Sequence, residues 1–277
     1  MMTAQTTHDY RYRTRRELFS QAWTAAHDHR VYPKLLLIQL LYVMVIVTFW
    51  VLALMGGAAM GWQAHRLDQF VHYGNELNGT LMWSVMSTIF VDLFGVIGLY
   101  AALNVIRHGG KAFNAASEVV QALHWRYVVG FICLSIVRSV IYTFGLILGL
   151  SFSVFAIAAH QNMAVVVLIV TASTALGLYL MCWVLLTYSQ AALVMRDRIN
   201  DGGDWTVFTV MRESRHLMRG YRFDLVQLYL SMWWLYLIDV VTLGIGLLFT
   251  TPIVNLAGAA FYDNRVRFAA LKQEMKM

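Results

Sequence analysis

Long blocks of apolar residues, separated by short polar and basic stretches, dominate the hydrophobic pattern of the chain. A helix needs roughly 20 consecutive apolar residues to cross about 30 Å of hydrocarbon, and the blocks approach or exceed that length. The pattern therefore predicts an all-α fold, a polytopic transmembrane helical bundle of about six spans. The blocks cover about residues 35–60, 80–106, 127–150, 163–194, 223–243 and 248–264.

The last two blocks leave an alternative open, because only the turn Gly244-Ile245-Gly246 separates them. Two full spans fit this pattern, and so does a re-entrant pair, which enters and leaves the bilayer on the same side. The predicted organisation is a basic amphipathic arm (1–34), a transmembrane domain (35–264) with cytoplasmic linkers (107–126 and 196–222), and a cytoplasmic tail (265–277).

The arm carries apolar residues at helical spacing between Arg15 and His29. We expect an amphipathic helix that lies on the inner membrane surface. A solvated helical arm without lipid contact is the alternative. The apolar residues of this stripe are Leu18, Phe19, Ala22, Trp23 and Ala26.

Composition and charge place the chain in a membrane. Apolar residues make up 59% of it and charged residues 13%, whereas soluble proteins have roughly half and a quarter. All of the 21 Lys and Arg residues except Arg66 and Arg138 lie in the arm, the two linkers or the tail. This asymmetry predicts a multi-pass protein of the bacterial plasma membrane with both termini in the cytoplasm. The net charge of +6 is spread over segments beside apolar blocks, so we expect no nucleic-acid partner.

The two linkers resemble each other. Each follows an Ala-Ala-Leu sequence, contains a Gly pair (Gly109-Gly110 or Gly202-Gly203) and continues into an amphipathic pattern, with Asp204 placed to cap the second helix. A duplicated unit of span, interfacial helix and span accounts for this, and so does chance similarity between apolar sequences. The apolar stripes are Phe113, Ala116, Val120 and Leu123 in the first linker, and Trp205, Phe208, Met211 and Met218 in the second.

The C-terminal third contains an ordered set of short motifs. They are the stretch Glu213 to Tyr221 with Ser214-Arg215-His216-Leu217-Met218-Arg219-Gly220, then Leu230-Ser231, Thr242 to Gly246, Pro252 and Phe261-Tyr262. With Arg16-Glu17-Leu18 near the N-terminus, this set resembles the bacterial membrane-protein family catalogued as domain of unknown function number 975. The chain departs from the family pattern at Trp234-Leu235, Val241 and Ile253. The resemblance implies a multi-span plasma-membrane protein without an established activity, some of whose relatives are associated with peptide antibiotics or export.

Asp92 and Arg138 form the candidate polar site inside the membrane. In the predicted topology both lie near the bilayer midplane, where an ionisable group costs about 2.5–3.5 kcal/mol, so we expect them to face the bundle and pair. The pair either marks a polar pathway or only fixes two helices. Asp239 is the third candidate, nearer the outer end of its block. Interhelical hydrogen bonds are the expected role of Gln39, Asn104, Gln190 and Asn255.

No motif for a nucleophile, a metal or a cofactor is present, and we expect the two cysteines, Cys133 and Cys182, to be reduced core residues. The sequence therefore predicts a non-enzymatic accessory or protective protein, such as one giving immunity to membrane-active peptides or supporting an exporter. A small transporter or channel that uses Asp92 and Arg138 is the alternative. Expected partners are the bilayer, anionic lipid head groups, and a membrane protein or a second copy of the chain. Candidate contacts to head groups or a partner are Arg15, Arg16, Lys111, Arg126, Arg212, Arg215, Arg219 and Arg222.

Overall fold

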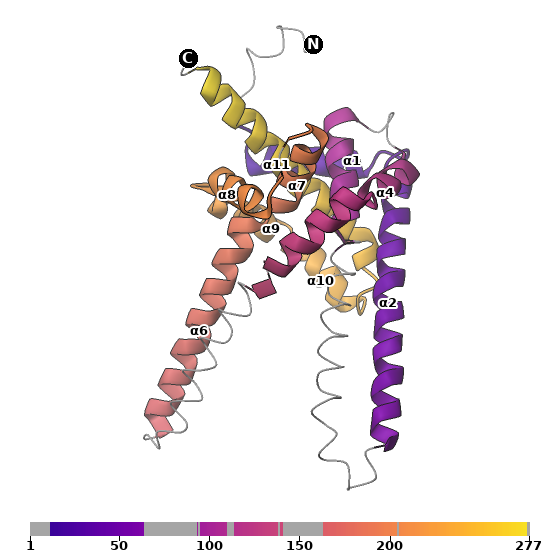
Figure 1. The fold of residues 1–277 in the computed structure, drawn as a ribbon, viewed down its shortest axis with the longest axis vertical. Helices are drawn as coiled ribbons and strands as arrows, with labels where there is room; N and C mark the ends of the chain where they lie inside the picture. Colours follow the sequence, from indigo (N-terminus) through magenta and orange to yellow (C-terminus); the bar gives the residue numbers. More distant parts are fainter. Residues whose placement is uncertain are drawn as a thin grey trace. The chain divides into compact units, whose positions relative to one another are not determined.

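A computed structural model describes residues 12–63, 93, 95–109, 114–137, 139–140, 163–203 and 205–275. Every regular element within those residues is a helix, as the apolar pattern predicts (Figure 1). In chain order the helices are α1 (Arg15–Ala26), α2 (Tyr32–Gln63), a helix over 95–108, α4 (Ala115–Ala122), a helix Trp125–Val137, α6 (Met163–Tyr188), α7 (Ala191–Asn200), α8 (Val207–Met218), α9 (Arg222–Ser231), α10 (Trp233–Val241) and α11 (Leu247–Glu274).

The chain forms two compact units. Unit 1 consists of Met1–His124 and Ser231–Asn264, and unit 2 consists of Trp125–Leu230 and Arg265–Met277. The long helix α11 contributes its N-terminal part to unit 1 and its C-terminal part to unit 2.

One helical stretch, Val165–Asn200, is long and apolar enough to cross a membrane. Two pairs of consecutive helices, each bent at its break, raise the number to three if each pair forms one span. These pairs are α4 with Trp125–Val137, and α9 with α10. The described residues therefore provide one to three helices that could span a bilayer, and the number six stays a prediction.

In unit 1, α2 contains the whole of the first predicted block, 35–60. Its shorter apolar stretch, Tyr32–Val45, exposes Leu37 and Met44 on one side and buries Leu35 and Ile38 on the other. An apolar helix with both faces apolar is expected where one side contacts protein and the other contacts lipid.

The apolar stripe of α1 packs against protein. Leu18, Ala22 and Ala26 are buried, and the Trp23 ring lies 5.9 Å from that of Trp234. The helix begins with a capping box, in which the Thr14 backbone N–H donates to the Glu17 carboxylate at 2.8 Å. The predicted amphipathic helix is present, but unit 1 itself covers its apolar stripe. The spacing of apolar residues identifies such a stripe without saying which surface covers it.

The middle of α11 is the most completely buried part of unit 1. Pro252 lies inside it, beyond the first turn, so its missing backbone N–H removes one intrahelical hydrogen bond. The small residues Ala257, Ala259 and Ala260 are buried and let neighbouring elements approach closely. Much of the predicted block 248–264 therefore contacts protein.

A tight turn joins α10 to α11. Leu243 has φ 52° and Gly244 has φ 90°, both in the left-handed region that favours glycine. The Gly246 backbone N–H donates to the Thr242 hydroxyl at 2.7 Å, which fixes the turn. Because α10 has only nine residues, or roughly 14 Å at 1.5 Å per residue, it is too short to cross a bilayer alone. Together with α9 it forms a bent pair that fits either one broken span or a re-entrant loop, so both alternatives stay open.

Changing Gly246 to Ala is expected to destabilise the protein by about 1–3 kcal/mol through overpacking. An added Cβ would lie 2.7 Å from Asp239 Oδ1 and 2.8 Å from Thr242 Oγ1, on either side of the turn. Thermal unfolding of the purified protein in detergent measures the effect. The control is Gly95→Ala, whose Cβ would meet Tyr42 at an ordinary 3.6 Å. Equal melting temperatures for the two variants would contradict the packing seen at this turn.

In unit 2, α6 is surrounded by little other protein. Apolar side chains point outward over most of its surface, with Leu168 exposed to 68%, and Val167, Leu176 and Leu178 also exposed, while a single stripe that includes Ser173 and Thr187 is buried. Both cysteines are free, and both are exposed, so the prediction that they are core residues is wrong. Cys182 lies on α6 and Cys133 on Trp125–Val137, and an apolar block predicts membrane burial without distinguishing a lipid-facing side from a protein-facing one.

Candidate functional site

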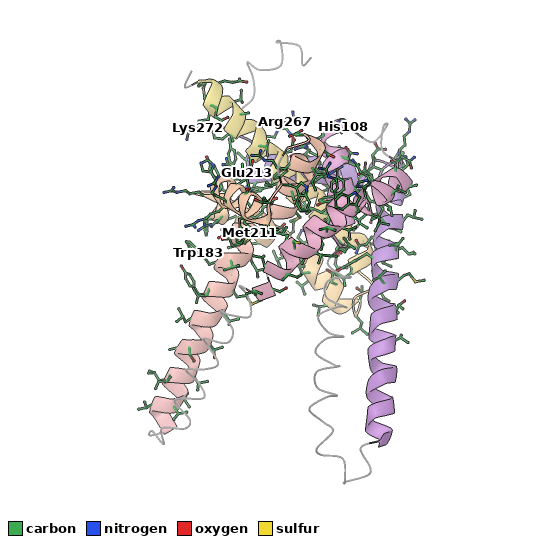
Figure 2. The ribbon with its side chains drawn as sticks, viewed as in Figure 1. His108, Trp183, Met211, Glu213, Arg267 and Lys272 are labelled. Atoms are coloured by element: carbon green, nitrogen blue, oxygen red, sulfur yellow. The ribbon has the colours of Figure 1, made fainter. Side chains whose placement is uncertain are left out.

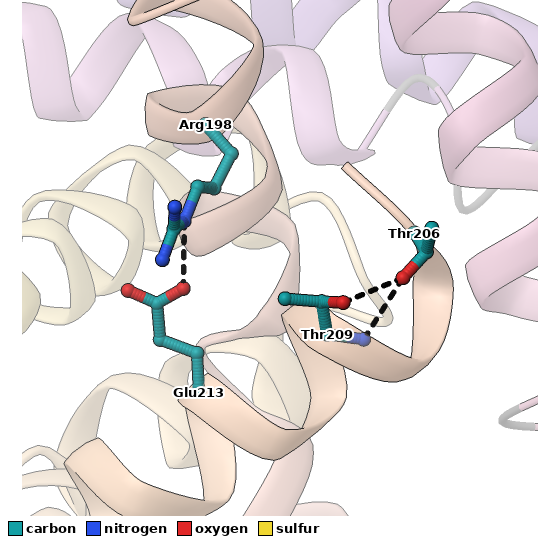
Figure 3. Close-up of polar contacts among 4 residues, drawn as sticks. All are labelled: Arg198, Thr206, Thr209 and Glu213. Atoms are coloured by element: carbon teal, nitrogen blue, oxygen red, sulfur yellow. Dashed lines mark hydrogen bonds and ion pairs between the residues drawn. The ribbon is translucent and has the colours of Figure 1, made fainter. Parts of the chain in front are cut away.

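Helix α8 in unit 2 carries the most basic surface predicted from the sequence. It begins at Val207, and its N-cap is Thr206, whose hydroxyl accepts from the Thr209 backbone N–H at 3.3 Å (Figure 3). The cap predicted at Asp204 is therefore wrong in position, and Asp204 itself lies outside the described residues. Thr206 has a side-chain oxygen that can accept the same hydrogen bond as Asp204, and the sequence pattern does not show which of the two residues caps the helix.

The two faces of α8 differ sharply. Val210, Met211, Ser214 and Met218 are buried, so two of the four predicted stripe residues pack inward. The opposite face is exposed and contains Phe208 at 78% exposure, together with the three arginines Arg212, Arg215 and Arg219. We call these three arginines the basic face of α8. An exposed aromatic ring beside exposed arginines is typical of a helix at a membrane surface.

Two polar contacts hold α8 in place. The buried Ser214 hydroxyl donates to the Thr187 carbonyl at the end of α6, at 3.1 Å. The Arg198 guanidinium of α7 donates to the Glu213 carboxylate at 2.9 Å (Figure 3). Helix α8 therefore packs against the C-terminal end of α6 and against α7.

The C-terminal end of α6 also carries an aromatic group. The Trp183 ring lies 6.1 Å from that of Tyr179, and the Arg222 guanidinium lies 4.1 Å above Trp183. From Val165 to Trp183 the helix rises roughly 27 Å, close to the hydrocarbon thickness of a bilayer. Trp and Tyr rings beside an arginine are typical of the boundary between hydrocarbon and water.

In unit 1, α4 exposes its predicted apolar stripe. Val120 is 72% exposed and Leu123 is also exposed, while the buried side of the helix consists of Ala115, Glu118 and Ala122. The remaining stripe residue near the helix start, Phe113, lies outside the described residues. The apolar side of α4 is thus available to lipid, whereas its inner side contacts α2.

The two linkers share a backbone feature. Gly109 and Gly202, the first residue of each Gly pair, have φ 73° and 68°, and nothing lies within 4 Å of where a Cβ would be. A glycine is therefore favoured at the end of each helix because of its left-handed backbone conformation, and not because a neighbouring group lies too close for a Cβ. This likeness is consistent with a duplicated unit, which stays a prediction.

Buried polar groups in unit 1 form a second cluster. The Arg107 guanidinium donates to the Asp263 carboxylate at 3.2 Å and lies 5.9 Å from the Tyr262 ring. Next to Arg107 in the sequence, His108 contacts the Asn104 amide oxygen at 2.8 Å, and the Asn104 amide donates to the buried Glu118 carboxylate. The interhelical hydrogen bond predicted for Asn104 is therefore present.

Changing Asp263 to Asn is expected to lower the free energy of unfolding by about 3 kcal/mol, because it removes one partner of a buried ion pair. Thermal unfolding in detergent measures this. The matched control is Glu213→Gln, which breaks the exposed pair with Arg198 and is expected to cost about 0–1 kcal/mol. If Asp263→Asn is no more harmful than Glu213→Gln, the cluster does not stabilise unit 1.

The predicted intramembrane pair, Asp92 and Arg138, lies outside the described residues, as does Lys111. Asp239 is partly buried, and its carboxylate accepts from the Thr250 hydroxyl at 2.7 Å, so it belongs to the turn between α10 and α11. Among the predicted head-group contacts outside α8, Arg15, Arg16 and Arg126 are exposed, and Arg222 is partly buried against Trp183.

Gln39 and Gln190 are buried, but the interhelical hydrogen bonds predicted for them are not seen among the described residues: Gln39 Nε2 has no partner there, and Gln190 donates to the adjacent Ser189 hydroxyl at 3.5 Å. Gln39 belongs to α2 and Asn255 to α11, and both approach Gly98, where an added Cβ would lie 2.9 Å from the Asn255 amide nitrogen. Gly98 thus marks a close approach of three helices in unit 1.

Unit 2 also contains a cavity of about 410 Å³ between the C-terminal end of α8 and the C-terminal part of α11. Arg219 in its wall is one of the contacts to head groups or a partner predicted from the sequence, whereas Arg265 and Lys272 were predicted only as charges of the cytoplasmic tail. The sequence signal that could have placed both residues on this helix is a helical periodicity that continues past Asn264, since α11 extends to Glu274.

No family model, curated protein or solved structure matches the chain. The resemblance to domain of unknown function number 975 therefore stays a prediction. Among the side chains that the structure describes, no group of three or more His, Cys, Asp or Glu residues is placed to hold a metal ion.

Proposed function

We propose that this chain is a multi-pass protein of the bacterial plasma membrane, with both termini in the cytoplasm, and that it acts as a non-enzymatic accessory or protective protein. The observation that carries the proposal is the outward-facing apolar surface of α6. Most of the side chains from Val167 to Leu178 are exposed, most of these exposed side chains are apolar, and a helix with so much exposed apolar surface is stable only in an apolar solvent.

The end of α6 supports a defined depth in the bilayer. Tyr179 and Trp183 lie beside Arg222, and α8 packs at the same end through the hydrogen bond between Ser214 and Thr187. With the aromatic rings at the boundary, Arg212 and Arg215 of the basic face of α8 reach the anionic lipid head groups of the cytoplasmic leaflet. Each arginine near such a surface contributes about 1 kcal/mol of attraction.

The exposed residues of α4 and of the turn after α10 extend the lipid contact to unit 1. Leu243 at the turn is 94% exposed, and Val240, Val241 and Ile245 are exposed beside it. A short hairpin whose tip is apolar enters a bilayer as a re-entrant pair, because its backbone hydrogen bonds are made within the hairpin.

The accessory or protective role is supported by the resemblance of the sequence motifs and by the basic face of α8. A protein with this face competes with cationic peptides for anionic lipid, or binds a partner such as an exporter subunit or a second copy of the chain. Immunity to membrane-active peptides and support of an exporter are the two forms of this role.

Topology is tested by labelling introduced cysteines with a membrane-impermeant maleimide, after Cys133 and Cys182 are changed to Ser. A cysteine at Arg212 is expected to react only after the cells are opened, because the positive-inside asymmetry places α8 in the cytoplasm. A cysteine at Gln69, in the segment predicted outside, is the control and is expected to react in intact cells. Labelling of the Arg212→Cys variant in intact cells would overturn the orientation.

The protective role is tested by deleting the gene and measuring the minimum inhibitory concentration of cationic membrane-active peptides. We expect the deletion to lower it and the wild-type gene to restore it. A variant with Arg212→Gln and Arg215→Gln is expected to restore it poorly, whereas Arg212→Lys with Arg215→Lys keeps the charge and restores it. Unchanged sensitivity after deletion would count against the protective role.

A further inference from the structure

The cavity between α8 and α11 in unit 2 is lined by an unusual set of side chains. Its volume is about 410 Å³, within the range of small-molecule sites. Four basic side chains contribute to its wall, and none of the lining residues that the structure describes carries a carboxylate. They are His216 and Arg219 from the end of α8, and Arg265 and Lys272 from α11.

Arg265 is the fixed element of this wall. The residue is only 6% exposed, its guanidinium lies 3.2 Å from the centroid of the Tyr221 ring, and the Phe268 ring lies at 5.8 Å. One of its nitrogens, Nη2, donates to the Leu217 carbonyl at 3.2 Å. Stacking and this hydrogen bond hold the planar group in one orientation, so little conformational entropy is lost when it binds an anion.

The chain between α8 and α9 brings Arg219 to the same wall. Gly220 has φ 84°, and nothing lies within 4 Å of where its Cβ would be. This left-handed residue turns the chain at the end of α8, so that Arg219 and Tyr221 both line the cavity. Ser214, Met218 and Gly220 of the sequence motif therefore shape this end of α8 without lining the cavity themselves.

An anion with several oxygen atoms fits this arrangement best. Donors reach the cavity from two helices, and a phosphate group accepts hydrogen bonds on several sides at once. The volume exceeds that of a phosphate group alone, which leaves room for the remainder of a ligand beside Phe268.

The cavity also lies on a particular side of α8. Figure 2 shows Lys272 on the opposite side of α8 from the apolar length of α6, on which Trp183 is labelled. If α6 lies in the bilayer, Lys272 faces the aqueous phase. We propose that this cavity binds the phosphate group of a water-soluble phosphate ester. Only the direction of approach rests on the proposed membrane function.

The test uses the purified full-length protein in detergent, with glycerol 3-phosphate as the probe and glycerol as the uncharged comparison, by isothermal titration calorimetry. Binding of glycerol 3-phosphate and not of glycerol is expected. A variant with Arg219→Gln and Lys272→Gln removes one charge from each helix at the exposed part of the wall. It is expected to weaken binding by about tenfold or more, since it removes two charge-assisted contacts.

The matched control is Arg212→Gln with Arg267→Gln, which removes one charge from each of the same two helices outside the cavity wall. It is expected to leave binding of glycerol 3-phosphate within about twofold, because neither side chain lines the cavity and salt screens charges that do not contact the ligand. Circular dichroism and melting temperature confirm that both variants fold. Equal weakening by the two variants, or no heat with glycerol 3-phosphate, would overturn the proposal.

A second experiment, in nanodiscs, distinguishes a lipid head group from a water-soluble ester as the source of the phosphate group. Nanodiscs containing phosphatidylglycerol are compared with nanodiscs of phosphatidylcholine alone, and glycerol 3-phosphate is titrated into each. The same affinity in both is expected if the ligand comes from the aqueous phase. Two results together would overturn the proposal of a water-soluble ligand and assign the cavity to a lipid head group. Phosphatidylglycerol would abolish binding of glycerol 3-phosphate to the wild-type protein, and the variant with Arg219→Gln and Lys272→Gln would keep the same weak affinity in both kinds of nanodisc.

Discussion

The need of α6 for an apolar solvent is the constraint on which the rest of unit 2 depends. Its outward side chains, from Val167 to Leu178, have too little protein around them to be buried by the chain. In a bilayer, lipid covers the same surface without a cost in free energy, and all backbone hydrogen bonds stay within the helix. At the C-terminal end of this helix, Trp183 lies between Tyr179 and Arg222 in a chain of contacts, and α8 packs at the same end through Ser214.

Helix type and approximate position followed from the sequence because the apolar blocks are long, and periodicity over a long segment is informative. What surrounds each helix did not follow. The stripes of α1, α4 and α8 look alike in the sequence, yet Leu18 of α1 and Met218 of α8 contact protein while Val120 of α4 is exposed. Periodicity reports that a face is apolar, and only the tertiary arrangement decides whether protein or solvent covers it.

The candidate site shows the same division. The basic residues of α8 were predictable because they lie on consecutive turns of one helix beside an apolar block. Arg265 was not, since its role depends on Tyr221 and Leu217, which are distant in sequence. The motif residues of the C-terminal third have clear structural roles: Ser214 ties α8 to α6, Gly246 closes a turn, and Tyr262 contacts Arg107. These roles stabilise the fold and by themselves indicate no chemistry.

Helix α11 has a consequence for biogenesis. It follows every other described helix in the sequence, and it supplies buried residues such as Leu256 and Phe261 to unit 1 and Arg265 to unit 2. While the ribosome is still translating the earlier helices, neither unit has this segment, so neither completes its packing during insertion into the membrane. A stalled or shortened nascent chain that lacks α11 therefore leaves both units incompletely packed, and this incomplete packing is what quality-control proteases would recognise.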